Sequence, residues 1–207
     1  MNSKISLIVP VFNESNEIKN FFSDLNSCDF NLINEIIFID DYSDDNSYKL
    51  LEYEINQFNK KSFNINFLIL NNLKNRGYGF SIKKGVEKSN NDSIAIIDLD
   101  RTYKIEDLNY IANQFVNDYK FKYDLIAGER TIDLTNTTRL KIIGKNIINF
   151  ITNFCFNEKI TDYNSGLRIF NKNKFKKHSH MMSNRFSLTT SMTITFLNEN
   201  YEIKFHK

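Results

Sequence analysis

The sequence predicts an α/β fold in which helices flank a doubly wound, mostly parallel β-sheet. Short apolar runs rich in isoleucine and valine alternate along the chain with longer segments whose apolar residues recur at helical spacing. One run and the helical segment after it take about 30 residues, the length of a right-handed β–α–β crossover. Because such crossovers connect parallel strands, the alternation indicates one continuous sheet.

The predicted strands are apolar on both faces, as expected for the buried strands of a parallel sheet. They cover residues 5–11, 35–40, 64–70, 93–98 and 123–127. A last strand is predicted at 201–205, where aromatic and branched residues alternate with charged ones.

Helices are predicted where apolar residues recur every three or four positions. Three such stripes consist of Ile18, Phe21, Phe22 and Leu25, then of Tyr48, Leu51, Ile55 and Phe58, then of Ile105, Leu108, Ile111, Ala112 and Phe115. Two more helices are predicted at 139–156 and 188–197. The helix at 139–156 is amphipathic, so it fits either the core of the domain or a peripheral contact with a membrane surface.

Length and composition restrict the classes of function. The chain of 207 residues fits one domain, and 27 basic against 25 acidic residues are too balanced for a protein that binds nucleic acid. No apolar run is long enough to span a membrane, and the N-terminus has no signal-peptide pattern. The two cysteines are far apart in the sequence. These features predict a reduced, cytoplasmic protein, and one long-range disulfide is the alternative.

In a sheet of this kind ligands bind beyond the carboxyl ends of the strands. Pro10 ends the first strand, and Asn13 after it can cap the next helix. The second strand ends at Asp40 and Asp41, where a carboxylate can accept hydrogen bonds from a base or a ribose. The loop at 75–79 contains two glycines, which allow close approach of the backbone to another group. It matches neither the dinucleotide fingerprint nor the P-loop.

The fourth strand ends in Asp98-Leu99-Asp100. If the chain is extended there, both carboxylates point to the same side. Two oxygen ligands at a sheet edge suit Mg²⁺ or Mn²⁺ bound jointly with a diphosphate. His178 and His180 have no third metal ligand near them in the sequence, and the surrounding lysines predict an exposed basic segment there.

Six motifs, in this order, resemble glycosyltransferase family 2 with its GT-A fold. The resemblance is greatest to the dolichol-phosphate mannosyltransferase-like branch, the polyprenyl-phosphate glycosyltransferases. The motifs are Ile8-Val-Pro-Val-Phe-Asn-Glu14, Ile39-Asp-Asp-Tyr-Ser43, Asn75-Arg-Gly-Tyr-Gly79, Asp98-Leu-Asp100, Ala127-Gly-Glu-Arg130 and Asp162-Tyr-Asn-Ser-Gly-Leu-Arg-Ile-Phe170. The resemblance implies a Rossmann-like sheet in one catalytic domain at 1–207. Residues 1–112 would form the nucleotide-sugar-binding half, and 113–207 the acceptor-side half, without the C-terminal continuation usual in the family.

The resemblance also implies an inverting transfer from a nucleotide-diphosphate sugar to a polyprenyl phosphate of the dolichyl or undecaprenyl type. The implied donor-binding residues are Pro10, Phe12, Glu14, Asp41, Gly77, Asp98, Leu99 and Asp100. Asp98 and Asp100 would hold Mg²⁺ or Mn²⁺, and Arg130 would act with them in catalysis. The implied acceptor and phosphate residues are Arg130, Arg139, Asp162, Ser165 and Arg168.

Two alternatives stay open at this point. The first is a glycosyltransferase of the same fold that acts on a sugar hydroxyl, although the chain has no tryptophan for the Gln-x-x-Arg-Trp motif usual in such enzymes. The second is a nucleotide-sugar-binding protein without turnover, because Thr189 and Thr190 stand in a segment where the family usually has a glutamate. A phosphate acceptor is already ionised at pH 7. Transfer of a sugar to it therefore needs positioning and charge neutralisation more than a general base.

Overall fold

A computed structural model describes residues 4–28, 31–59, 65–117, 122–129 and 162–206. The first half contains β1 (Ile5–Val11), α1 (Ser15–Ser27), β2 (Ile33–Asp40), α2 (Ser47–Asn59), β3 (Asn66–Asn71), α3 (Tyr78–Lys88), β4 (Ser93–Ile96) and α4 (Ile105–Asn117). The second half contains β5 (Leu125–Gly128), β6 (Arg168–Asn171), α6 (Lys172–His178), a 3-10 turn (Ser179–Met181), α7 (Leu188–Asn198) and β7 (Ile203–His206).

The described strands form one sheet in the order β3-β2-β1-β4-β6-β5-β7. All neighbouring strands are parallel except β6, which runs antiparallel to β4 and to β5. The predicted α/β class with a mostly parallel sheet is therefore confirmed. The register pairs Val11 with Asp40, so the loops that follow β1 and β2 begin side by side at the same edge.

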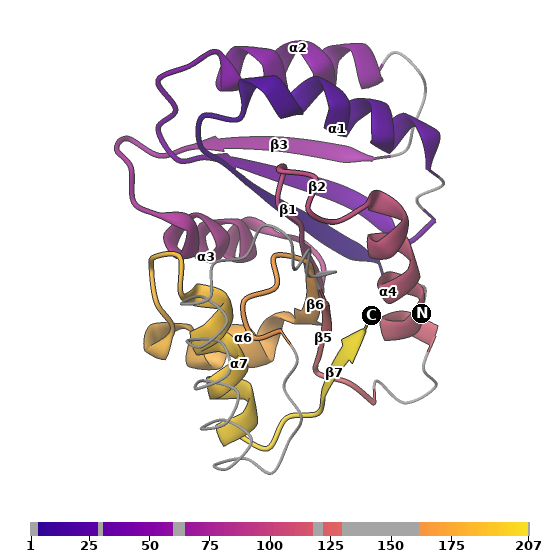
Figure 1. Ribbon diagram of the computed structural model, residues 1–207, viewed down its shortest axis with the longest axis vertical. Coiled ribbons are helices and arrows are strands. Elements are labelled where there is room, and N and C mark those ends of the chain that lie inside the picture. Colours follow the sequence, from indigo (N-terminus) through magenta and orange to yellow (C-terminus); the bar gives the residue numbers. More distant parts are fainter. Residues whose placement is uncertain (1–3, 29–30, 60–64, 118–121, 130–161, 207) are drawn as a thin grey trace, which may run out of the picture.

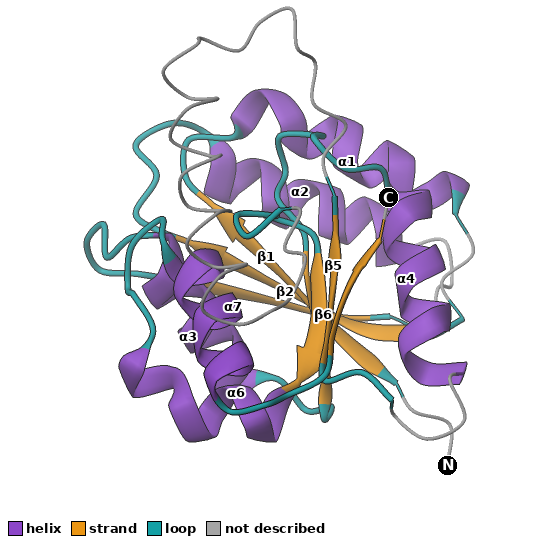
Figure 2. Cartoon of the chain, turned by 60° about the horizontal axis from the view of Figure 1, so that its bottom comes forward, coloured by secondary structure: helices purple, strands orange, loops and turns teal. Residues whose placement is uncertain are grey.

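Helices cover both faces of the sheet (Figure 1, Figure 2). They enclose two hydrophobic cores, one on each face. On one face, α1, α2 and α4 pack against a core that includes Phe22 and Phe38, whose rings stack at 5.6 Å. On the other face, α3, α6 and α7 contribute Ile82, Phe175 and Phe196. Because helices cover both faces of the sheet, β1, β2 and β4 are apolar on both sides.

Helix α3 lies outside the predicted set because two of its residues are glycines, which weaken a helical pattern. One of them, Gly85, allows the helix to lie close to the sheet. A Cβ at that position would lie 2.8 Å from Ile8 Cγ2 and 2.8 Å from Ile39 Cδ1. The glycine that weakens the sequence pattern is thus required by the packing.

Several predictions about local structure need correction. Strand β3 is half-exposed because it forms the edge of the sheet, and β4 ends at Ile96 instead of continuing to residue 98. Strand β6 is absent from the predicted strands because it begins with an arginine and ends with an asparagine, so no apolar run marks it. His178 is buried, not exposed, and its Nε2 lies 3.1 Å from the Tyr201 hydroxyl. The predicted helix at 139–156 lies outside the described residues.

Within the described ranges, no helix combines the length and the apolarity needed to cross a membrane. Cys28 is a free thiol, so it forms no disulfide in this structure.

Candidate active site

A cavity of about 460 Å³ opens at the carboxyl edge of β1, β2 and β4. Every residue predicted to contact a nucleotide sugar lines it, namely Pro10, Phe12, Glu14, Asp41, Gly77, Asp98, Leu99 and Asp100. These residues come from the end of β1 and from the loops that follow β1, β2, β3 and β4, and the parallel sheet brings these loops together. The same cavity is also lined by residues that were not predicted, among them Tyr78, Arg185 and Phe186.

The loops after β1 and β2 are hydrogen-bonded to each other. The Asn13 amide donates to Ser43 Oγ over 3.0 Å, and the Glu14 amide donates to Ser47 Oγ over 2.8 Å. Glu14 itself is the N-cap residue of α1, and Asn13, which was expected as a cap, adopts a positive φ of 57° in the loop. These hydrogen bonds fix the loop that carries Phe12. The Phe12 side chain is half-exposed and lines the cavity.

Asp41 holds the glycine loop in place. Its carboxylate accepts hydrogen bonds from Asn72 Nδ2 at 2.7 Å, from the Arg76 amide at 2.8 Å and from the Gly77 amide at 2.7 Å. Gly77 has a φ of 93°, a conformation that glycine adopts readily and other residues rarely do. Asp41 thus has a structural role in addition to the contact predicted for it with a base or ribose.

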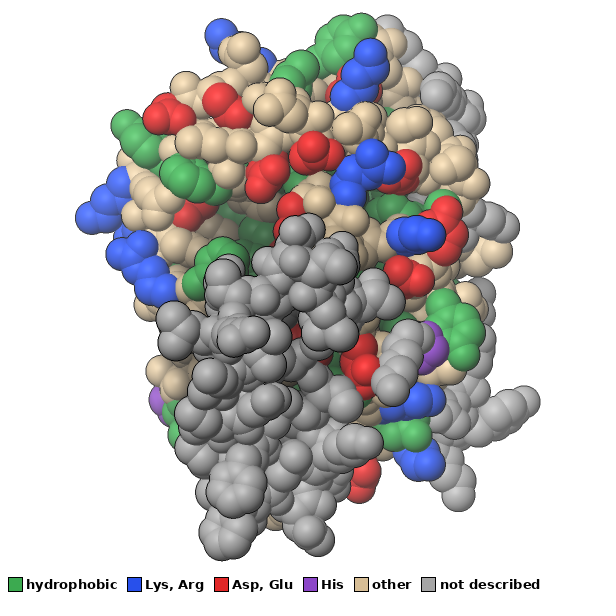
Figure 3. Space-filling view, in the orientation of Figure 1, with side chains coloured by type: hydrophobic (Ala, Val, Ile, Leu, Met, Phe, Trp, Pro, Cys, Tyr) green, Lys and Arg blue, Asp and Glu red, His purple; other side chains and the backbone are tan. Residues whose placement is uncertain are grey.

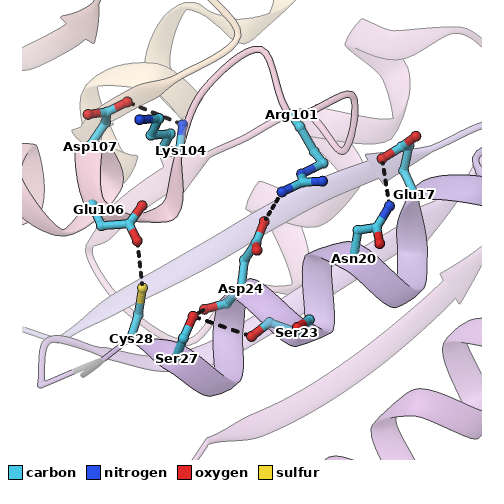
Figure 4. Close-up of polar contacts among 10 residues, drawn as sticks. All are labelled: Glu17, Asn20, Ser23, Asp24, Ser27, Cys28, Arg101, Lys104, Glu106 and Asp107. Atoms are coloured by element: carbon cyan, nitrogen blue, oxygen red, sulfur yellow. Dashed lines mark hydrogen bonds and ion pairs between the residues drawn. The ribbon is translucent and has the colours of Figure 1, made fainter.

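Asp98 and Asp100 reach the cavity from a turn, not from an extended strand. Strand β4 ends before them, and the Thr102 amide donates to Asp100 Oδ1 over 3.0 Å. Between them and Thr102, Arg101 has a φ of 57° and pairs with Asp24 of α1 at 3.4 Å (Figure 4). The turn, in place of strand alternation, presents both carboxylates to one cavity.

Carboxylates are crowded around this cavity. Burial raises the pKa of Glu14, and the charges of Asp100, Glu17 and Asp45 raise it further. Burial and the Asp98 carboxylate likewise raise the pKa of the Tyr78 phenol well above its ordinary value. Figure 3 shows acidic and hydrophobic side chains next to one another in the upper half of the face that it draws. A cavity crowded with carboxylates favours a bound cation.

The donor set fits Mg²⁺ or Mn²⁺ held jointly with a substrate. Asp98 and Asp100 both offer carboxylate oxygens to the cavity, as these cations prefer. In the part of the chain that the structure describes, no group of three or more His, Cys, Asp or Glu side chains is arranged to hold a metal by itself. The remaining ligands would therefore be oxygens of a bound diphosphate or water.

The segment from Asp162 to Arg168 lies behind the cavity. Ser165 is fully buried, and its Oγ accepts a hydrogen bond from the Tyr103 hydroxyl at 2.9 Å. Gly166 packs directly on Asp98, since a Cβ there would overlap Asp98 Oδ2 and lie 2.7 Å from Cγ. This segment, predicted to contact the acceptor, forms the support of a predicted metal ligand.

Arg168 is predicted to contact phosphate, but the structure buries it completely. Its Nε donates to the Ser165 carbonyl at 2.8 Å, and its two terminal nitrogens donate at 2.7 Å to Thr193 Oγ1 and to the Tyr163 carbonyl. Burial lowers the pKa of the guanidinium to about 10, so it is still charged at neutral pH. The side chain therefore clamps the 163–165 backbone to α7 and does not line the cavity. Arg130 and Arg139 lie outside the described residues.

Comparison with known proteins identifies the family. The sequence profile of glycosyl transferase family 2 matches residues 6–179. The chain belongs to this family. It is 28% identical over 208 residues to a UDP-N-acetylglucosamine–dolichyl-phosphate N-acetylglucosaminyltransferase of Methanococcus voltae, with 95% of this chain and 80% of the relative covered. It is also 28% identical over 137 residues to a dolichyl-phosphate beta-glucosyltransferase of Dictyostelium discoideum, with 63% of this chain and 41% of the relative covered.

Solved structures of glycosyltransferases share the fold. A glucosyl-3-phosphoglycerate synthase from Mycobacterium tuberculosis, solved with Mn²⁺, UDP and phosphoglyceric acid, has a TM-score of 0.73 at 10% identity, and the match covers 99% of this chain and 68% of the other. A mannosyltransferase from Pyrobaculum calidifontis, solved with GDP-mannose and Mn²⁺, has a TM-score of 0.66 at 14% identity, with 98% and 54% covered. These likenesses establish the GT-A fold of this family 2 glycosyltransferase.

Sequence reasoning missed Arg185 and Phe186 because they are distant from the other motifs in the chain. They reach the cavity through packing of the 183–186 segment on the glycine loop. The one indication in the sequence is Gly79, since a glycine in a short loop favours close approach of another backbone. The sequence does not indicate which segment packs against Gly79.

Proposed function

We propose that this family 2 glycosyltransferase moves a sugar from a nucleotide-diphosphate donor to a polyprenyl phosphate, with inversion at the anomeric carbon. The observation that carries the proposal is the meeting of all the predicted donor residues in one cavity of about 460 Å³. Pro10 and Phe12 offer an apolar wall for the base, and Asp41 and Glu14 offer acceptors for the hydroxyls of the ribose. Residues 1–112 supply most of this donor half, and residues 113–207 the acceptor half.

Asp98 and Asp100 are the residues that would hold Mg²⁺ or Mn²⁺. When bound, the cation would neutralise negative charge on the departing diphosphate. The chain's own contribution is to hold the two carboxylates at the cavity wall, through the hydrogen bond from the Thr102 amide to Asp100 and the packing of Gly166 on Asp98. A fixed pair of carboxylates lowers the reorganisation that metal binding would otherwise require.

The acceptor assignment is supported by the relatives, two of which are named for dolichyl phosphate. A lipid phosphate is ionised at pH 7 and needs no general base, so a site built for positioning and charge suits it. Arg130 and Arg139 are the arginines proposed for the acceptor or donor phosphates, and the 139–156 segment is proposed for peripheral contact with the lipid surface.

The decisive experiment is a transfer assay with UDP- and GDP-sugars, Mn²⁺ and a short-chain polyprenyl phosphate in detergent. The product should be a lipid-linked sugar phosphodiester, which mild acid cleaves, whereas an ordinary glycoside would resist the acid. Asp100→Ala should abolish transfer and the metal-dependent part of nucleotide binding. Asp92→Ala is the matched control, because Asp92 is an exposed aspartate at the opposite end of β4.

Three outcomes would contradict the proposal. Transfer to a sugar hydroxyl alone would indicate a different acceptor class. Nucleotide binding without transfer to any acceptor would indicate a binding protein without turnover. Unchanged transfer and unchanged metal-dependent binding in Asp100→Ala would remove the role assigned to the aspartate pair.

A further inference from the structure

We propose that Arg185 is a phosphate-binding residue of the donor cavity, presented there by the glycine loop at 75–79. The inference rests on the proposed function and adds a ligand-contacting residue to it. Arg185 belongs to the segment between the 3-10 turn and α7, far in sequence from every motif that predicts the donor site. It nevertheless lines the cavity together with Asp98 and Asp100.

Two glycines place Arg185 at the cavity. A Cβ on Gly77 would lie 2.9 Å from Arg185 Cδ, and a Cβ on Gly79 would lie 2.8 Å from the Asn184 carbonyl carbon and 3.0 Å from the Arg185 oxygen. The Phe80 amide also donates to the Asn184 oxygen over 3.0 Å. Only residues without a side chain allow the glycine loop and the segment at 183–185 to approach so closely. The glycine loop therefore determines the position of Arg185.

The backbone around Arg185 is held by further hydrogen bonds. Lys83 Nζ of α3 donates to the Met182 oxygen at 2.6 Å and to Asn184 Oδ1 at 2.8 Å. The Arg185 amide donates to Ser183 Oγ at 3.0 Å. The Arg185 oxygen accepts from the Leu188 amide at 3.1 Å, at the start of α7. A backbone fixed in this way lowers the conformational entropy that the segment loses when Arg185 binds a ligand.

The charge of Arg185 is available to a ligand. Of the described residues that line the cavity, it is the one cation, whereas Glu14, Asp41, Asp98 and Asp100 are carboxylates. Arg185 takes part in none of the ion pairs found among the described residues, and its side chain is exposed. A guanidinium suits phosphate because two parallel N–H groups can bind two oxygens.

The ligand chemistry is a phosphate oxygen pair, which the donor diphosphate and the acceptor phosphate can both supply. A cation at the wall of the cavity complements a metal at the aspartate pair, because the nucleoside diphosphate that departs carries one negative charge more than the diphosphate of the intact donor, and one divalent ion does not neutralise it. Arg185 would therefore bind phosphate oxygens in the same cavity as the carboxylates that would hold the metal.

The test compares Arg185→Gln and Arg185→Lys with the wild type. The control is Lys88→Gln, which also removes one exposed cation but does so at the far end of α3, about 15 Å along the helix. Calorimetry with UDP and GDP in Mn²⁺ measures the donor arm, with uridine and guanosine as probes that lack phosphate. The KM for a short-chain polyprenyl phosphate at saturating donor measures the acceptor arm. Circular dichroism and the melting temperature check the fold of each variant.

Loss of one charged hydrogen-bonding group should weaken phosphate binding about tenfold or more. If the donor supplies the oxygens, Arg185→Gln weakens nucleoside-diphosphate binding, leaves nucleoside binding unchanged, and Arg185→Lys restores part of the loss. If the acceptor supplies them, the KM for the lipid phosphate rises and diphosphate binding does not change. Folded Arg185→Gln that matches Lys88→Gln in both arms would overturn the inference and leave the proposed function intact. A wild type that binds no nucleotide would overturn both.

Discussion

Gly166 lies against the carboxylate of Asp98, so closely that a single methyl group on Gly166 would overlap Asp98 Oδ2. The two residues are far apart in sequence, and the contact joins the segment behind the cavity to the predicted metal ligand. Arg168 holds that segment by its bonds to the Tyr163 and Ser165 carbonyls. The position of Asp98 therefore depends on residues that do not touch the cavity.

Gly166→Ala should displace Asp98 and weaken Mn²⁺-dependent nucleotide binding, at a cost to the free energy of unfolding of about 1–3 kcal/mol from overpacking. Gly85→Ala is the control, because its Cβ would press on Ile8 and Ile39 in the core, away from the cavity. We expect it to lower the melting temperature and leave Mn²⁺-dependent binding by the folded protein unchanged. Calorimetry and thermal unfolding separate the two effects, and normal binding by Gly166→Ala would contradict the role assigned to this contact.

Asp41→Asn should lower the free energy of unfolding by about 2 kcal/mol, because an amide nitrogen would then face backbone N–H groups that now donate to a carboxylate. Nucleotide binding should weaken at the same time, since the glycine loop loses its support. Urea unfolding measures the first effect. Asp44→Asn, at an exposed aspartate in the same acidic loop, should change neither property. Equal stability of the two variants would exclude the structural role of Asp41.

Arg168→Met should destabilise the fold by about 3 kcal/mol or more, because it leaves the Tyr163 and Ser165 carbonyls and Thr193 Oγ1 without their donor. Arg168→Lys should recover part of this loss, because it keeps the charge but not the fork geometry. Urea unfolding at pH 7 is the measurement. If Arg168 served only to bind phosphate, its substitution would have the opposite effect: phosphate affinity would be lost and the stability of the fold retained.

Cys28 provides a prediction of pH dependence. Its Sγ lies 3.7 Å from Glu106 Oε1 (Figure 4), and burial, followed by the charge of Glu106, raises the pKa of the thiol. Because the thiolate is the reactive form, alkylation should be slow at pH 8 and should accelerate only above the ordinary range for cysteine. Glu106→Gln removes the repulsion, so the rate profile should move to lower pH.

The measurement is the rate of iodoacetamide labelling between pH 7 and 10 in a Cys155→Ser background, in which only Cys28 can react. Glu87→Gln serves as the control, because Glu87 is an exposed glutamate on α3. If Glu106→Gln and Glu87→Gln gave the same profile, Glu106 would not be the cause of the raised pKa.

The strand pattern and the acidic residues at the strand ends of the first half could be predicted because both depend on local sequence. Buried parallel strands are apolar runs, and the residues that follow them must lie at one edge of the sheet. Asp41 and the Asp98–Asp100 pair could therefore be assigned to one site without a structure, and the family resemblance added Pro10; all four line one cavity. Helix α3 could not be predicted in the same way, since its glycines serve packing against β1 and β2.

Strand periodicity and loop position are local properties, so they were enough to predict the fold class and the edge of the sheet at which the site lies. The full set of donor residues was predicted from the family resemblance of the motifs. The packed structure was needed to show that Arg168 is a buried clamp, that Gly166 supports Asp98 and that Arg185 reaches the cavity. These roles come from contacts between segments separated by many residues. Such contacts depend on the shape of the packed chain, and no spacing within the sequence encodes them.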